Sequence, residues 1–66
     1  MEMYAITATV FHIDKVKKWE RSMSIPTFFL NATVQGIVSE AHAITIAEDI
    51  INPFGHYRTS ITAVAV

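Results

Sequence analysis

Apolar and polar positions alternate along three stretches of the chain, and each alternation predicts a β-strand. The stretches are residues 3–13, 27–34 and 57–66. Neither face of the first stretch carries a charge, so we expect it to be a central strand with both faces at least partly covered. Val, Ile and Thr make up 22 residues against a single Leu, and these β-branched side chains favour strands over a helical bundle.

A helical period replaces the alternation in residues 40–52. Ser39 is suited to cap the start of a helix, Glu40 suits its first turn, and Pro53 ends it. The broad apolar face predicts a helix lying on a sheet. Its main contacts with the sheet are expected from Ile44, Ile46, Ala47, Ile50 and Ile51.

Residues 14–24 connect the first two strands and hold four of the five basic residues. Val16, Trp19 and Met23 lie at helical spacing, which predicts a short helix within residues 14–23. A long, mobile hairpin connection is the alternative, because one or two turns of helix are marginal without docking.

These elements predict a single small α+β domain over residues 1–66. A right-handed crossover through the helix makes the second and third strands parallel, and the first strand inserts between them, antiparallel to both. The expected fold is a three-stranded antiparallel or mixed sheet, a split β-α-β arrangement in the order second, first, third. One helix covers one face, so Met3 and Phe11 on the other face are candidates for an oligomer interface.

Composition also predicts self-association. Burial of apolar surface and the entropy cost of ordering 66 residues nearly cancel, at about 100 kcal/mol each. The chain has no Cys, so no disulfide compensates, and 52% of its residues are hydrophobic against 17% charged. We expect the excess apolar surface to lie in the interface of a homodimer or a higher oligomer.

Other classes of protein are excluded or disfavoured. The chain is too apolar for disorder, and its longest uncharged stretch, residues 22–39, holds too many polar residues and a proline for a membrane span. The start lacks the pattern of an export signal, so we expect a cytoplasmic protein without membrane contact. A net charge of −1 argues against a nucleic-acid footprint over the whole domain.

One resemblance adds to this picture. The segments VQGIVSEAHA (residues 34–43) and IAEDIINPFG (46–55), together with PTFFL (26–30) and TAV (62–64), resemble small uncharacterised proteins encoded by bacteriophages of mycobacteria and related actinobacteria. The resemblance covers about residues 26–66, and the basic segment before it is less typical. It implies a phage accessory protein made in the host cytoplasm, and it implies no activity and no site residues.

No residue pattern indicates catalysis. His42 lacks a second histidine one helical turn away, as a metal site on one helix would need, and the adjacent Glu48 and Asp49 point about 100° apart. No serine lies at a recognisable nucleophile spacing from a histidine, and no glycine-rich loop is present to hold a phosphate. We therefore expect neither an enzyme nor a bound cofactor.

The most distinctive feature is the basic segment with its tryptophan. Three interpretations remain open: contact with nucleic acid, a protein-binding loop anchored by Trp19, or a solvated surface over a packed Trp19. A local net charge of only +2 argues against strong phosphate binding. We expect an interaction module that binds a host or phage protein, with weak nucleic-acid binding as the alternative. The candidate partner-binding residues are Lys15, Lys17, Lys18, Trp19 and Arg21.

Overall fold

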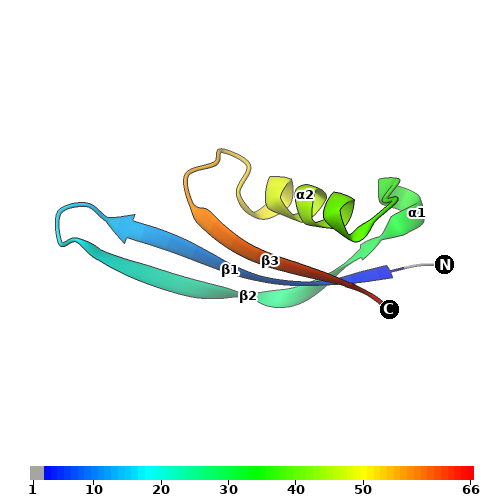
Figure 1. The fold of residues 1–66 in the computed structure, drawn as a ribbon, viewed down its shortest axis with the longest axis horizontal. Helices are drawn as coiled ribbons and strands as arrows, with labels where there is room; N and C mark the ends of the chain where they lie inside the picture. Colours follow the sequence, from blue (N-terminus) through cyan, green and yellow to red (C-terminus); the bar gives the residue numbers. More distant parts are fainter. Residues whose placement is uncertain (1–2) are drawn as a thin grey trace.

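Three strands and two helices make up residues 3–66, the part of the chain that this computed structural model describes. In chain order they are β1 (Met3–Asp14), β2 (Trp19–Asn31), α1 (Ala32–Gln35), α2 (Glu40–Ile51) and β3 (Arg58–Ala65). The strands form one antiparallel sheet in the order β2-β1-β3 (Figure 1). The α+β class, the strand order and the long helix are therefore confirmed.

Residues 14–24 form no helix. They complete β1, turn through residues 15–18 and open β2, with Asp14 paired to Trp19 and Thr9 paired to Ser24. Pairing with β1 gives the backbone N–H and C=O groups of this segment hydrogen-bond partners. A helix of one or two turns without a docking surface is marginal, so the strand pairing is favoured over it. The helix predicted within residues 14–23 is wrong for this reason.

β2 begins earlier than expected and continues through Pro26. Between the pairs Ile6–Phe28 and Ala8–Ile25 the register shifts, so that Thr7 lies opposite two residues of β2, Pro26 and Thr27. Such a bulge accommodates a residue that has no N–H to donate. The proline therefore marks an irregularity inside the strand and not the strand's beginning.

β2 also ends earlier than expected, at Asn31. The Asn31 side chain accepts hydrogen bonds from the N–H groups of Thr33 and Val34 at 2.9 and 3.0 Å, which caps the short helix α1. Gly36, with φ of 66°, ends that helix in the left-handed conformation. Residues 32–34, predicted as the end of the second strand, are helical because of this cap.

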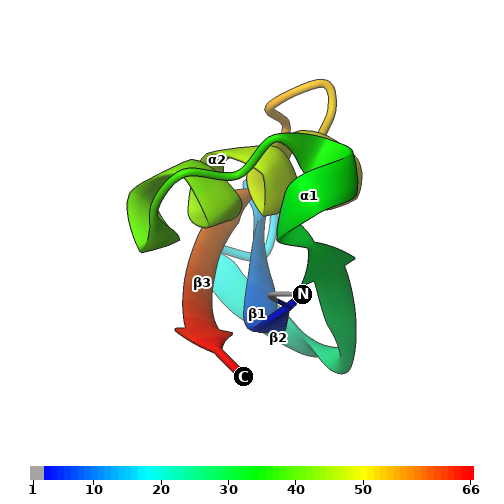
Figure 2. The same cartoon turned by 90° about the vertical axis from the view of Figure 1, so that its right-hand side faces the viewer.

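Both helices lie on the same face of the sheet (Figure 2). Ser39 caps the start of α2, because its side chain accepts from the His42 N–H, and the helix approaches the sheet through Ala43 and Ala47. The buried core consists of Tyr4, Ile6, Leu30, Ala32, Ile37, Ala43, Ala47 and Ala63. Five of the ten buried hydrophobic residues of the described chain are alanines, so this core is thin.

The expected contacts of α2 are confirmed in part. Ala47 is buried, and Ile44 and Ile46 pack against the core, whereas Ile51 is half-buried beside a groove. Ile50 is 52% exposed, so its expected role as a main contact is wrong. Ile50 belongs to the last turn of α2, which lies beyond the core and borders that groove.

The molecule is more extended than a compact chain of its length. Its radius of gyration is 13.3 Å, against about 10.8 Å expected for 66 residues. Its accessible surface is 4775 Å², against about 4,200 Å² for a compact monomer. The cause is visible in Figure 1, where the β1–β2 hairpin extends well past α2 and β3.

Candidate functional site

The distal end of the β1–β2 hairpin stands apart from the rest of the sheet. The pair Phe11–Arg58 is the last between β1 and β3, whereas β1 and β2 remain paired as far as Asp14 and Trp19. Residues 12–21, which we call the arm, therefore form a two-stranded ribbon (Figure 1). The basic segment singled out in the sequence lies on this arm.

The tip of the arm is an ordered turn. One carboxylate oxygen of Asp14 accepts hydrogen bonds from the N–H groups of Val16 and Lys17, both at 3.0 Å. The Lys18 N–H donates to the Asp14 carbonyl at 2.7 Å. Lys18 has φ of 56°, in the left-handed region that favours glycine or asparagine. The turn thus holds a lysine in a conformation that costs free energy.

Replacing Lys18 by glycine is expected to stabilise the fold by about 1 kcal/mol, because glycine adopts positive φ without the clash of a side chain. Urea unfolding measures the change. Lys17→Gly is the matched control, since it removes the same charge at a residue that does not have positive φ. Equal effects of the two substitutions would show that the Lys18 backbone stores no strain.

Charge is distributed unevenly over the molecule. All five basic residues lie on the arm or at the adjacent start of β3, together with Asp14 and Glu20, which gives this end a net charge of +3. Helix α2 carries three acidic residues and no basic one. The Arg58 guanidinium pairs with Glu20 at 3.0 Å and lies 4.4 Å from the ring centre of Phe11. Among residues 3–66, the cations of the arm without an acidic partner are Lys15, Lys17, Lys18 and Arg21.

Trp19 and Arg21 lie side by side on the arm. The guanidinium carbon of Arg21 is 5.0 Å from the centre of the Trp19 ring, and Trp19 is 40% exposed. A cation over an exposed ring presents an apolar face and a positive charge together. The interpretation of Trp19 as a residue packed beneath solvating lysines does not fit this exposure.

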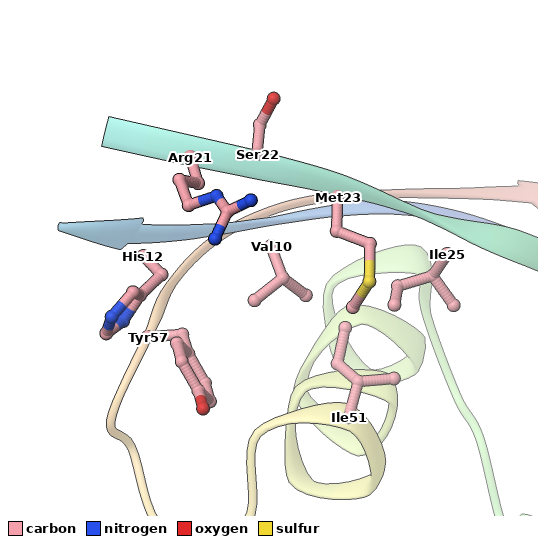
Figure 3. A pocket seen from close by; sticks show the side chains of 8 residues that line it. All are labelled: Val10, His12, Arg21, Ser22, Met23, Ile25, Ile51 and Tyr57. Carbon is pink, nitrogen blue, oxygen red and sulfur yellow. The ribbon is translucent and has the colours of Figure 1, made fainter. Parts of the chain in front are cut away.

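A groove of about 520 Å³ opens between the arm and the end of α2 (Figure 3). Its floor is apolar, formed by Val10 of β1 and by Met23 and Ile25 of β2, and Ile51 and Tyr57 close one side. In Figure 3 the side chains of Val10, Met23 and Ile51 point into the same space. The polar residues of the lining are His12, Arg21 and Ser22.

The turn between α2 and β3 borders this groove and is fastened by Asn52. The Asn52 amide nitrogen donates to Glu48 at 3.0 Å and to the Tyr57 carbonyl at 2.7 Å, and its oxygen accepts from the Tyr57 N–H at 3.3 Å. The second carboxylate oxygen of Glu48 accepts from the Thr59 hydroxyl. Asn52 is the one buried polar residue among those described. Its bonds hold both ends of the turn in a fixed position.

Phe54 stands at the top of this turn. It is 82% exposed, between Pro53 and a Gly55 whose φ of 68° completes the turn. The His56 ring, centred 5.9 Å away, is its one ring contact within residues 3–66. A large aromatic side chain is therefore presented to solvent on a rigid support.

The structure gathers the predicted partner-binding residues and separates them from the predicted interface. Lys15, Lys17 and Lys18 lie at the arm tip, with Trp19 and Arg21 directly behind them. Met3 and Phe11 lie on the open sheet face, both half-buried. Arg58 already covers Phe11, and small polar side chains, namely Thr7, Thr9, Ser24, Ser60 and Thr62, occupy the middle of that face.

Sequence reasoning missed the groove and the Asn52 fastening. It also assigned no role to Phe54. The dipeptide Asn52-Pro53 after a helix is the signal that could have indicated a side-chain cap there. No local sequence pattern indicated the groove, because its lining residues come from four separate segments, namely β1, β2, α2 and the turn.

His42 and His12 make contacts with neighbouring residues of the fold. The Nδ1 of His42 accepts a hydrogen bond from the Val38 N–H at 3.3 Å, and His12 lies edge-on to Tyr57 with ring centres 5.7 Å apart. Within residues 3–66, no three His, Asp or Glu side chains gather closely enough to hold a metal ion. Neither helix of this part of the chain has the length and apolar character needed to cross a membrane.

Comparison of the chain with protein-family models, with curated proteins and with solved structures finds no match. The resemblance of residues 26–66 to phage proteins therefore stays a prediction.

Proposed function

We propose that the protein is a non-enzymatic, homo-oligomeric interaction module that binds another protein through its arm. The observation that carries this proposal is the exposed Trp19 with Arg21 stacked on it, on a ribbon that projects beyond the sheet. Tryptophan and arginine are among the residues enriched at the positions that dominate binding energy in interfaces.

The charges of the arm indicate the chemistry of the partner. Lys15, Lys17 and Lys18 surround the tip, and Arg21 adds a fourth cation behind it. A partner surface with an apolar patch for Trp19 and carboxylates around that patch would complement this arrangement. Following the resemblance of residues 26–66, we place the partner, a host or phage protein, in the cytoplasm of an infected cell.

Weak nucleic-acid binding is the second candidate, and the arm carries one observation in its favour. A two-stranded ribbon fits the major groove of DNA, and the strained backbone of Lys18 holds a cation where a glycine would be more stable. Against it stand the small number of cations and the three acidic residues of α2. Affinity for phosphates scales with the number of neutralised phosphates, so four cations give weak binding at physiological salt.

Capture experiments test the protein partner. Immobilised protein is expected to retain a specific protein from a nuclease-treated mycobacterial lysate, also at raised salt, because an apolar anchor does not depend on counterion release. Trp19→Ala should abolish capture. Ile13→Ala is the matched control, since Ile13 is an exposed apolar residue of the same arm that pairs with Glu20, not with Trp19. Capture that needs intact nucleic acid would contradict the proposal.

Titration with a random DNA duplex tests the alternative. We expect binding at low salt and a dissociation constant of about 10 µM or weaker at physiological salt, as for non-specific phosphate contacts. Fluorescence of Trp19, the single tryptophan of the chain, reports the binding. Submicromolar binding at physiological salt would reverse the order of the two candidates.

A further inference from the structure

The turn after α2 carries an exposed aromatic side chain, and the groove beside it is apolar at its floor. Phe54 is a large, exposed side chain on a turn that Asn52 holds in place. The groove is apolar at its floor, and its volume of about 520 Å³ exceeds what one phenylalanine side chain fills. Rigid aromatic residues that enter apolar pockets are typical anchors of protein interfaces.

Phe54 cannot fill the groove of its own chain while the turn has this conformation. The groove is lined by Tyr57 and Ile51 on either side of the turn, whereas Phe54 does not contribute to its lining and stays 82% exposed. A Phe54 side chain that fills the groove must therefore come from another molecule. A second copy of this chain is such a molecule, and every copy carries one Phe54 side chain and one groove.

Charge is complementary in the same pairing. Arg21 and His12 lie at the groove, and the arm beyond them is basic. The turn that carries Phe54 follows the acidic end of α2, where Asp49 is exposed. A Phe54 that enters the groove of another copy carries the acidic end of its own α2 toward the basic arm of that copy, and we assign Asp49 and Arg21 to this contact.

We propose that two copies associate about a two-fold axis, with the Phe54 of each copy inserted into the groove of the other. The arm and the turn of each molecule enclose an open angle, seen in Figure 1, and two such angles interlock in a reciprocal contact. Identical surfaces meet, so the assembly closes as a dimer. This inference rests on the proposed function in one respect: it says which surface forms the homo-oligomer proposed there.

The available surface supports a dimer of this kind. The chain exposes 4775 Å², about 570 Å² more than a compact monomer of its mass. An interface of standard size buries about 800 Å² on each partner. The groove and the turn are the surfaces that this dimer would bury, and the tip lysines lie outside them.

Sedimentation velocity over a wide concentration range tests the dimer. The wild-type chain is expected at twice 7.4 kDa in the micromolar range. Phe54→Ala should raise the dimer dissociation constant at least about tenfold, as loss of an anchor does. Val38→Ala is the matched control, since Val38 is 86% exposed on the link before α2, and it should leave the constant unchanged.

A charge exchange tests the orientation of the two copies. Arg21→Asp and Asp49→Arg should each weaken the dimer, and the double variant should restore it, because the attraction returns with its signs reversed. Circular dichroism confirms folding of each variant. A double variant no tighter than the single ones would overturn the assigned contact.

The remaining outcomes separate this inference from the proposed function. A wild-type mass of 7.4 kDa at high micromolar concentration would overturn the dimer and the homo-oligomeric part of the proposed function, while partner binding through Trp19 is decided by the capture experiment alone. A dimer that Phe54→Ala leaves intact would overturn this interface and direct attention to Met3 and Phe11 on the open face. A Phe54-dependent dimer that captures no partner through Trp19 would support the inference and refute the proposed function of the arm.

Discussion

Ile6→Ala is expected to abolish the folded state. Ile6 is the one large side chain of the described residues that is fully buried, at 0% exposure. Removing three carbon atoms from such a site costs about 2–5 kcal/mol, because a cavity adds to the lost transfer free energy. A domain of this size rarely has more than about 3–5 kcal/mol in total. Urea unfolding followed by circular dichroism measures the loss.

Ile50→Ala is the control for this experiment. The substitution removes the same atoms from a side chain that is 52% exposed, so we expect a loss below about 1 kcal/mol. Equal losses at the two positions would contradict the assignment of the core. The expected contrast also replaces the sequence-based interpretation, in which Ile50 was a main contact of the helix.

The fold was predictable because its periodic elements are strong. Residues 3–13 alternate without a charge, which placed β1 in the centre of the sheet, and Ser39 and Pro53 bound α2 on both sides. Right-handed crossover then left one simple strand order. These arguments use local patterns and general topology, and neither depends on how individual side chains pack.

The start and end of β2 were not predictable by the same route. Val16, Trp19 and Met23 have helical spacing, but pairing with β1 decides the conformation of their segment. The sequence places the start of the second strand at residue 27, just after Pro26, because the bulge opposite Thr7 cannot be inferred from one strand alone. At the other end, the hydrogen bonds of Asn31 to Thr33 and Val34 override an alternation that continues in the sequence.

The candidate site was half predictable. Cations and a tryptophan clustered in sequence remain clustered on any hairpin, so the residues of the arm were found without knowledge of its conformation. The groove depends on where α2 ends relative to β1 and β2, which brings Ile51 beside Val10 and Met23. The position of the end of α2 relative to these two strands cannot be read from the pattern of a single sequence.

The arm and the thin core are linked energetically. Ala43 and Ala47 let α2 approach the sheet closely, but they bury little area, and the arm adds exposed surface without adding to the core. Stability must then come from ordered polar contacts or from a second copy. The buried side-chain hydrogen bonds of Asn52 lie at the turn after α2, and the contact that we propose with a second copy involves Phe54 of the same turn.

Asn52→Ala is accordingly expected to have the second largest effect. The substitution removes three hydrogen bonds and leaves the Tyr57 N–H and C=O and one Glu48 oxygen without their partner. At about 1 kcal/mol for each bond, the cost is about 3 kcal/mol. Thermal and urea unfolding measure it, and the released turn should also weaken any contact made by Phe54.

Thr59→Val is the graded control for Asn52→Ala. It removes only the hydroxyl that donates to Glu48 and keeps the shape of the side chain, so we expect a loss of about 1 kcal/mol. Asn52→Asp is the sharper variant, because it keeps the acceptor for the Tyr57 N–H but places a second carboxylate against Glu48 in a buried position. We expect Asn52→Asp to be at least as damaging as Asn52→Ala. An Asn52→Asp protein as stable as the wild type would show that Asn52 does not fasten the turn.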